Sequence, residues 1–205
     1  MGGRIITMAT TDEIDQLVER LNASKAGDRV EAQKQLISMG QAVSDALAAV
    51  LRTGTDYQRA HTAIVLGRIK DVRALAALMD MRAHPDLLIR MEAAKALGTL
   101  ENPHAVAALI DWLGTEESVL VQTSIVQALA GVAAEPVLNA LINALHHTES
   151  PSLRYLIIRV LGQRGDRRAI DVIFPYLKDP DYHVQRETIL ALGKLGFMPD
   201  KDREQ

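Results

Sequence analysis

Apolar residues return along this chain at the spacing that places them on one face of an α-helix. In residues 85–114 the pattern occurs twice in succession. The first helix has its apolar face at Ile89, Ala93, Ala96 and Leu97, and the second at Ala105, Leu109 and Leu113. Spacings of three, four and seven residues are those of an amphipathic helix, so this segment predicts a pair of helices.

The same helix pair recurs along most of the sequence. One position of the first helix is marked by six leucines: Leu36, Leu66, Leu97, Leu129, Leu161 and Leu192. They lie 30, 31, 32, 32 and 31 residues apart, and glycine directly follows four of them. Such a period predicts a solenoid in which each pair packs on its neighbours. A helical glycine costs about 1 kcal/mol relative to alanine, so its return in register predicts that it ends the helix or admits a neighbouring one.

Polar residues keep the same register as the leucines. Seven positions before each leucine stands a long hydrogen-bonding side chain: Arg29, Arg59, Arg90, Gln122, Arg154 and Gln185. About five positions after it, Asp71, Asn102 and Asp166 are good N-cap residues. We expect these three to cap the second helices. We also expect arginines such as Arg90 to tie adjacent units through hydrogen bonds to nearby acids or carbonyls.

The repeat that runs from Asp86 to Gly98 and on to Leu109 resembles HEAT repeats of the short phycobilin-lyase type. The resemblance covers roughly residues 26–196. It implies an all-α fold, a right-handed α-α superhelix (solenoid) of helix pairs with about 31 residues per repeat. Two positions depart from the pattern, because Ile37 and Ala130 stand where glycine is expected.

We expect a single repeat domain over residues 11–198. Residues 11–24 carry four apolar residues on one face and predict a capping helix. Full repeats are expected near residues 26–54, 55–84, 85–114, 115–148 and 149–179, followed by a half repeat at 180–196. Residues 1–10 predict a disordered N-terminus, and residues 199–205 predict a C-terminal tail.

The composition narrows the chemistry that the chain could perform. There is no cysteine, which removes disulfides and thiolate chemistry. The six histidines form no His-Glu dipeptide, and no Walker A, HExxH or GxSxG motif is present. We therefore expect no catalysis, no cofactor and no metal site. Because no signal peptide or membrane-spanning run is found, we expect a cytoplasmic protein without a membrane partner.

The distribution of charge bears on possible partners. The net charge is −3, and no Lys or Arg occurs between Lys95 and Arg154. A DNA duplex would be repelled there, so a HEAT-like nucleic-acid-binding protein is the less favoured alternative. Five arginines gather within residues 154–168. Two explanations stay open for this Arg-rich segment: solubility with ion pairs on helix faces, or binding of an anionic partner.

The sequence favours a protein-interaction scaffold or adaptor that binds its partner on a concave or central surface. Aligned second helices place short acidic or amide side chains beside large apolar ones, which suits a basic, partly apolar protein segment. Residues 118–147 hold one charged residue, Glu135, so the fourth repeat is also a candidate interface, homotypic or with another protein. The predicted partner-binding residues are Asp80, Asp111, Trp112, Gln127, Asn139, Asn143, Asp171 and Tyr176.

Two alternatives to this interpretation stay open. Trp112 and Tyr176 could instead fill gaps between helices. The resemblance to phycobilin-lyase repeats implies a second function, that of a tetrapyrrole (bilin) lyase-like or chromophore-handling protein. No chromophore motif is present in the sequence to support that function independently.

Overall fold

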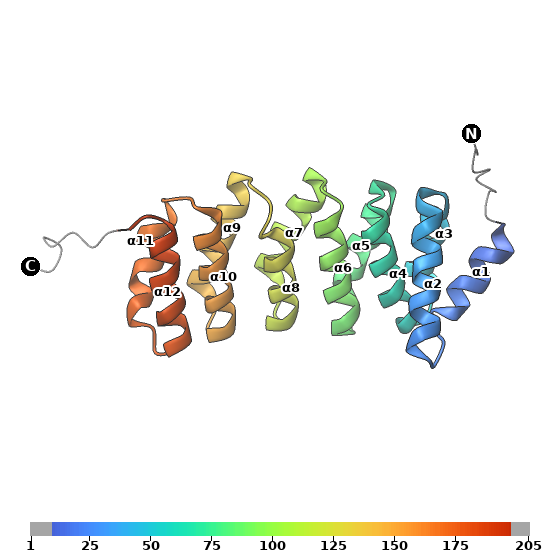
Figure 1. Ribbon diagram of the computed structural model, residues 1–205, viewed down its shortest axis with the longest axis horizontal. Coiled ribbons are helices and arrows are strands. Elements are labelled where there is room, and N and C mark those ends of the chain that lie inside the picture. Colours follow the sequence, from blue (N-terminus) through green and yellow to red (C-terminus); the bar gives the residue numbers. More distant parts are fainter. Residues whose placement is uncertain (1–9, 198–205) are drawn as a thin grey trace, which may run out of the picture. The chain divides into compact units, whose positions relative to one another are not determined.

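The computed structural model describes residues 10–197, and every regular element in that range is helical (Figure 1). The predicted all-α fold class, built from repeated helix pairs, is therefore confirmed. The predicted C-terminal tail and residues 1–9 of the predicted N-terminal segment lie outside the described residues. The chain divides into two compact units, Met1–Leu109 and Ile110–Gln205, and the division falls inside one helix, α7 (Pro103–Thr115).

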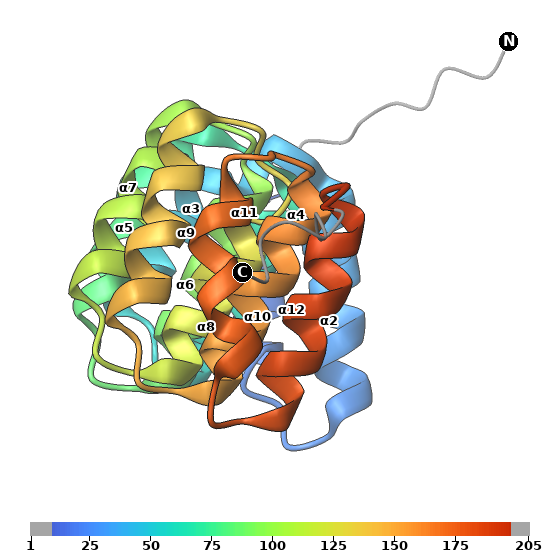
Figure 2. The same cartoon turned by 90° about the vertical axis from the view of Figure 1, so that its left-hand side faces the viewer.

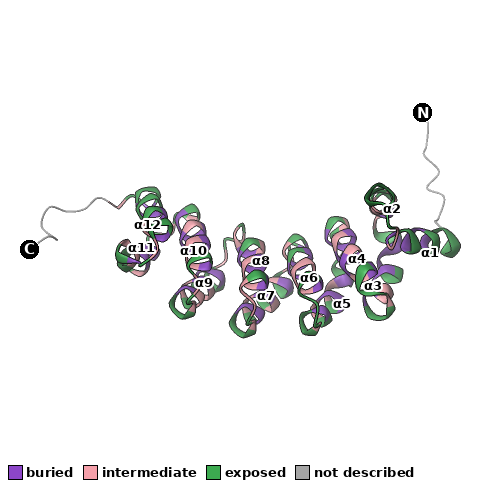
Figure 3. Cartoon of the chain, turned by 90° about the horizontal axis from the view of Figure 1, so that it is seen from below, coloured by how far each residue is buried: buried purple, intermediate pink, exposed green. Residues whose placement is uncertain are grey.

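Unit 1 contains the first three helix pairs and the capping helix. Its elements are α1 (Thr11–Arg20), α2 (Ala26–Met39), η1 (Gly40–Val43), α3 (Ser44–Thr53), α4 (Asp56–Ile69), η2 (Val72–Ala74), α5 (Leu75–Asp80), η3 (Met81–Ala83), α6 (Leu87–Thr99) and the start of α7. The helices that carry the marker leucines, α2, α4 and α6, form one layer, and α3 and α5 lie in the other (Figure 3). The core between them is aliphatic, with Leu36, Leu47 and Leu66 fully buried.

Unit 2 repeats the same plan. Its elements are the end of α7, then α8 (Val119–Leu129), α9 (Glu135–His147), α10 (Pro151–Arg164), α11 (Ala169–Ile173), η4 (Phe174–Lys178) and α12 (Tyr182–Lys194). Helices α8, α10 and α12 form the first-helix layer, whereas α9 and α11 belong to the second-helix layer (Figure 3). The last second helix changes from α to 3₁₀ geometry at Phe174–Pro175, because proline has no N–H for the α-helical bond.

The recurring glycine admits a neighbouring helix at two junctions. A Cβ placed on Gly67 would lie 2.9 Å from the Cα of Ala96, and one on Gly162 would lie 2.6 Å from the Cβ of Ala191. Both distances are too short for real atoms, so α4 meets α6, and α10 meets α12, only because these residues lack a side chain. The close-approach interpretation of the glycine is confirmed at these two positions.

The Arg/Gln column ties each first helix to the loop before it. Arg29 donates to the carbonyl of Ala23, and Arg90 donates to that of His84. The two glutamines of the column make the equivalent hydrogen bond. Gln122 donates to the carbonyl of Glu116 at 2.7 Å, and Gln185 donates to that of Asp179 at 2.7 Å. Each bond satisfies a carbonyl that the preceding helix or loop leaves without a partner. The predicted tie to carbonyls is confirmed.

The predicted N-caps also accept the expected bonds. The side chains of Asp71, Asn102 and Asp166 accept from the backbone N–H two residues later. Asp71 is buried and also binds Arg73, whose hydrogen bond lowers the pKa of the Asp71 carboxyl to about 2. The capping interaction therefore persists well below neutral pH.

Candidate functional site

The predicted partner-binding residues do not form one surface. In unit 1, Asp80 is exposed at the end of α5. In unit 2, four of the residues are exposed on the helices of the second-helix layer: Asp111, Asn139, Asn143 and Asp171. Gln127 is exposed as well, but it lies on α8 in the first-helix layer (Figure 3). A partner on the second-helix layer would therefore not reach Gln127.

The two aromatic residues of the set contribute to the interior more than to the surface. Trp112 is 3% exposed, and its indole N–H donates to a Glu116 carboxylate oxygen at 3.0 Å. Tyr176 is half-buried, and its hydroxyl donates to the carbonyl of Leu145 at 3.0 Å. Their polar atoms are thus engaged within unit 2, which matches the interpretation that they fill gaps between helices.

A cavity of about 400 Å³ lies beside one of the predicted residues in unit 2. Its wall includes Gln122, Asn143 and His147 together with apolar residues of α7 and α9. The Gln122 amide is already bonded to the Glu116 carbonyl, and the His147 ring is bonded to the Asn143 carbonyl at 2.8 Å. Two of these three polar side chains that could recognise a ligand there, Gln122 and His147, are therefore bonded to the protein's own backbone.

Most arginines of the Arg-rich segment form ion pairs or hydrogen bonds with other residues of the protein. Arg154 forms a two-pronged pair with Asp179, at 2.7 and 3.0 Å. Arg164 donates to the backbone carbonyls of Val132 and Ala134, and burial lowers the pKa of its guanidinium. Arg168 pairs with Asp166 and Glu135. Ion pairing and capping therefore account for three of the five arginines.

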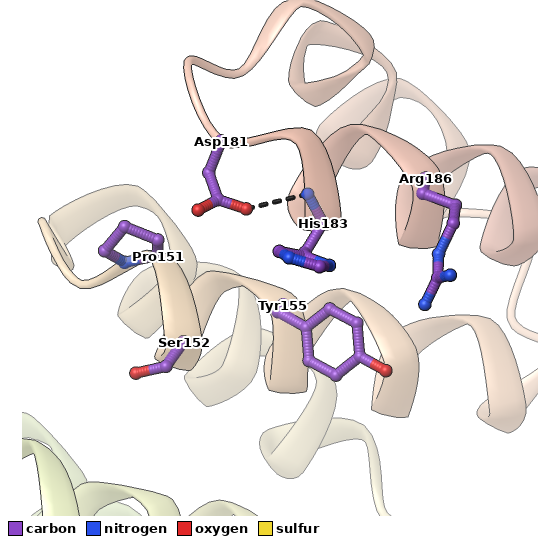
Figure 4. A pocket seen from close by; sticks show the side chains of 6 residues that line it. All are labelled: Pro151, Ser152, Tyr155, Asp181, His183 and Arg186. Carbon is purple, nitrogen blue, oxygen red and sulfur yellow. Dashed lines mark hydrogen bonds between the residues drawn. The ribbon is translucent and has the colours of Figure 1, made fainter.

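Arg159 contacts an aromatic ring instead of a carboxylate or carbonyl, and that ring lines a second cavity. Its guanidinium carbon lies 5.6 Å from the ring centroid of Tyr155, one turn earlier on α10. Tyr155 lines an open cavity of about 490 Å³ between the N-terminal halves of α10 and α12. Across from it stand His183 and Arg186 on α12, and Pro151, Ser152 and Asp181 complete the lining (Figure 4). We call this the α10–α12 cavity.

The N-terminal caps of α10 and α12 fix the ends of the two helices that carry the cavity residues. Ser150 caps α10, with Pro151 in the first turn, and Asp181 caps α12 by accepting from the N–H groups of His183 and Val184. The Asp181 carboxylate is therefore occupied by the helix end (Figure 4). Within the part of the chain that the structure describes, Arg186 forms no ion pair. An aromatic ring and a guanidinium group that line the same cavity, Tyr155 and Arg186, suit a flat, conjugated and negatively charged ligand.

The sequence contains a signal for this cavity, although the predicted partner-binding residues include none of its lining. Tyr155 and Arg186 are 31 residues apart, so they occupy the same position of successive repeats. In the earlier repeats this position holds Val30, Ala60, Met91 and Thr123. Two large side chains with ring or guanidinium groups in adjacent repeats distinguish this junction from the others.

Within residues 10–197, no group of three or more His, Asp or Glu side chains gathers in a way that could hold a metal ion. None of the helices in this range is both long enough and apolar enough to cross a membrane.

Comparison with known proteins identifies the family. The model of the HEAT repeats family matches residues 44–130 and 138–203, which together make up most of the chain. The chain is a HEAT-repeat protein. The predicted resemblance to the phycobilin-lyase type is also confirmed by its relatives.

Three curated relatives have names that refer to phycocyanin or bilins. The chain is 26% identical to "Uncharacterized phycocyanin operon protein Z" of Pseudanabaena tenuis, over 89% of its own length and 79% of the relative's. It is 25% identical to "Phycocyanobilin lyase subunit alpha" of a Picosynechococcus species, over 76% and 65%. It is 33% identical to "Bilin biosynthesis protein PecE" of Mastigocladus laminosus, over 47% and 36%. The chain thus spans less than two thirds of the last two relatives.

Solved structures agree on the fold. The Escherichia coli protein YibA has a TM-score of 0.68 at 19% identity, over 87% of this chain and 69% of that one. The complex of CpcE and CpcF of phycocyanin lyase from Nostoc has a TM-score of 0.54 at 20% identity, over 96% and 81%. A designed armadillo repeat protein in complex with a (KR)4 peptide has a TM-score of 0.54 at 18% identity, over 89% and 99%.

One expectation from the sequence has to be corrected. The absence of familiar catalytic motifs led us to expect a protein without enzymatic activity. Relatives named as a lyase subunit and as a bilin biosynthesis protein contradict that expectation. The physical reason for the error is that a motif search detects chemistry in short contiguous segments, whereas a solenoid assembles a site from residues one repeat apart.

Proposed function

We propose that this HEAT-repeat protein has a bilin lyase-like function, in which it binds a linear tetrapyrrole and delivers it to an acceptor protein. The observation that carries the proposal is the α10–α12 cavity, which is lined by the Tyr155 ring and by Arg186, with the Arg159 guanidinium carbon 5.6 Å from the centroid of that ring. A bilin is flat, conjugated and carries two propionate groups. Aromatic stacking and charge-assisted hydrogen bonds are the interactions that such a molecule needs.

The roles of the cavity residues follow from their chemistry. The Tyr155 ring would stack on a pyrrole ring, and the Arg186 guanidinium would bind a propionate. His183, which is exposed at the cavity, would donate to or accept from the ring system. The names of the relatives support this choice of ligand, because two of them refer to a bilin.

The proposal is tested by titrating the purified protein with phycocyanobilin and following the visible absorption spectrum. Binding should change the spectrum, and Arg186→Gln should weaken binding at least tenfold, since a hydrogen bond to a charged group contributes about 1.5–3 kcal/mol. Tyr155→Leu should weaken it several-fold through loss of stacking. Arg167→Gln is the matched control, because it removes an exposed arginine of the same unit that does not line the cavity.

Two results would count against this function. One is an unchanged spectrum at saturating bilin. The other is equal affinity of wild type and Arg186→Gln. Transfer is measured separately, as colour that remains on apo-phycocyanin after denaturation when bilin and the protein are supplied together.

We also propose that the acceptor protein binds on the second-helix layer of unit 2. The exposed residues there, Asp111, Asn139, Asn143 and Asp171, are short and acidic or neutral. Such side chains lose little conformational entropy on binding and are compatible with a polar, partly basic partner surface. This layer is opposite the one that carries the α10–α12 cavity, so the two ligands would not compete for the same residues.

A further inference from the structure

The cavity of about 400 Å³ in unit 2 lies where one repeat has a small residue and the repeats on both sides have large ones. The second helices place Val50, Met81, Trp112, Ala144 and Tyr176 at the same position of successive repeats. Met81 and Trp112 are buried, and Tyr176 is half-buried. Ala144 has the shortest side chain of the five, and it lines the cavity. We call this the Ala144 cavity.

Tyr176 shows what fills the equivalent space at the next junction. Its hydroxyl donates to the carbonyl of Leu145, which lies in the last turn of α9. One repeat earlier the equivalent carbonyl is that of Leu113, in the last turn of α7. Leu113 lines the Ala144 cavity, and within residues 10–197 no side chain donates to its carbonyl. The same space and the same acceptor are therefore present at this junction, without the tyrosine.

Polar side chains at the Ala144 cavity also offer hydrogen-bond acceptors. The Nδ1 atom of His147 lies 2.8 Å from the carbonyl oxygen of Asn143, so Nδ1 carries the hydrogen and Nε2 of the neutral ring is an acceptor. Gln122 uses its amide N–H for the Glu116 carbonyl, which leaves its own carbonyl oxygen as an acceptor. In the described part of the chain, the Asn143 carboxamide makes no hydrogen bond. These groups favour a ligand that ends in an O–H or N–H.

The rest of the wall is apolar and favours a ring. Its apolar residues come from α7, α9 and α10: Ile110, Leu113, Ala140, Ala144 and Leu153. The volume falls within the ~300–1,000 Å³ of typical ligand pockets. Atoms that line an unfilled apolar space lose their dispersion contacts. An aromatic side chain in the cavity would restore them.

The Ala144 cavity opens on the second-helix layer. Its exposed lining residues, Gly114, Asn143 and His147, belong to α7 and α9, whereas Leu153 of α10 is buried. The end-on view shows α9 and α11 in one layer and α10 and α12 in the other (Figure 2). An occupant from outside therefore enters from the surface on which we place the acceptor protein, and not from the layer that carries the α10–α12 cavity.

We propose that the Ala144 cavity receives a tyrosine side chain of the acceptor protein. This inference rests on the proposed function, which places that protein on the second-helix layer of unit 2. The ring packs on the apolar wall, and the hydroxyl donates to the Leu113 carbonyl, as Tyr176 donates to Leu145 at the next junction. An aromatic side chain in a desolvated pocket is a typical hot spot of a protein–protein interface.

The first test supplies the ring from the protein's own helix. Ala144→Tyr fills the cavity, so it should weaken binding of apo-phycocyanin at least tenfold in surface plasmon resonance. It should also raise the urea denaturation midpoint, because the ring restores contacts with the wall. Ala76→Tyr is the matched control, since it makes the same change at an exposed position of α5 that does not line the cavity. It should leave binding unchanged and should not raise the midpoint.

The second test does not depend on the acceptor protein. p-Cresol, the tyrosine side chain without its backbone, is titrated into the full chain while the alanine methyl signals are followed by NMR. The Ala140 signal should shift saturably in the wild type and in Ala76→Tyr, but not in Ala144→Tyr. Toluene lacks the hydroxyl and should bind several-fold more weakly, because it leaves the acceptors of the cavity unpaired.

Two comparisons separate this inference from the proposed function. Ala144→Tyr should bind phycocyanobilin like the wild type, because the α10–α12 cavity is formed by other helices. Asn139→Lys changes the second-helix layer outside the Ala144 cavity. If Asn139→Lys weakens binding of apo-phycocyanin and Ala144→Tyr does not, the acceptor surface stands and the tyrosine pocket is wrong.

Three further outcomes would overturn the proposal. The first is an Ala140 signal that p-cresol leaves unchanged in the wild type. The second is a lower denaturation midpoint for Ala144→Tyr, which would show that the cavity does not admit the ring. The third is a doubled mass in light scattering that Ala144→Tyr restores to the monomer value, which would identify a second copy as the occupant.

Discussion

At the residue scale, the glycine that follows the marker leucine has two different environments in the same register. A Cβ added to Gly162 in α10 would collide with Ala191, whereas a Cβ added to Gly193 in α12 would meet nothing within 4 Å. Both residues are helical, so the intrinsic gain from replacing glycine by alanine is the same at the two positions. Any difference between the two substitutions must therefore come from the helix crossing.

Gly162→Ala should lower the free energy of unfolding by about 1–3 kcal/mol, because the added methyl group has to displace the backbone of α12. Gly193→Ala should be neutral or raise it by up to about 1 kcal/mol. Urea denaturation followed by circular dichroism measures both. Equal effects of the two substitutions would show that the crossing at Gly162 is not as close as the structure has it.

At the scale of secondary structure elements, the sequence pattern did not predict the backbone conformation of the loops between helices. Lys70 and Glu101 have φ angles of 57° and 51°, in the left-handed region, at equivalent positions 31 residues apart. Glycine would adopt this conformation more readily. The two side chains form an ion pair with each other across adjacent repeats, which offsets little of this backbone cost, because both are exposed to solvent.

The layers also separate two residues that the sequence grouped in one interface, the fourth repeat. Gln127→Lys and Asn143→Lys add the same charge to the first-helix and second-helix layers of unit 2, respectively. If the acceptor protein binds on the second-helix layer, Asn143→Lys should weaken its binding about tenfold through charge and desolvation. Gln127→Lys should leave it unchanged. Binding to apo-phycocyanin by surface plasmon resonance gives the comparison, and a loss with Gln127→Lys alone would contradict the assignment of layers.

At the scale of the whole molecule, stability should be distributed along the chain by repeat. Each helix pair contacts mainly its neighbours, so a helix inside unit 2 is held from two sides. Within the described chain, α12 packs chiefly on α10 and on the α11–η4 segment. Leu141 in α9 and Leu192 in α12 are both almost completely buried. Burial alone would predict similar costs for their truncation.

Leu141→Ala should cost about 2–5 kcal/mol, as expected for a buried leucine in a well-packed core. Leu192→Ala should cost less, because α12 can unfold locally without disrupting the rest of the unit. Hydrogen exchange should report faster exchange in α12 than in α9 in the wild-type protein. The same loss of stability for both variants would mean that unit 2 unfolds as a single cooperative body.

The sequence by itself determined the repeat, the helix pairs, the caps at Asp71, Asn102 and Asp166, and the role of the Arg/Gln column. These features depend on interactions between residues close in sequence or one repeat apart, and a constant period makes such interactions visible as columns. Gln122 and Gln185 occupy the position that holds arginine in the other repeats. They still donate a hydrogen bond to the preceding loop, because the glutamine amide reaches the equivalent carbonyl.

Only the tertiary structure decided which side chains are free to act. Ion pairs engage Arg154 and Arg168, and hydrogen bonds to backbone carbonyls engage Arg164. By contrast, Arg186 lines an open cavity together with Tyr155. Trp112 is buried although its column appeared to face a partner, and Ile189 is exposed although its column is buried in the four preceding repeats. The physical reason is that the exposure of a side chain depends on whether a neighbouring helix covers it. Repeat periodicity predicts the position of a residue on its own helix, but it does not predict whether a neighbouring helix covers that position.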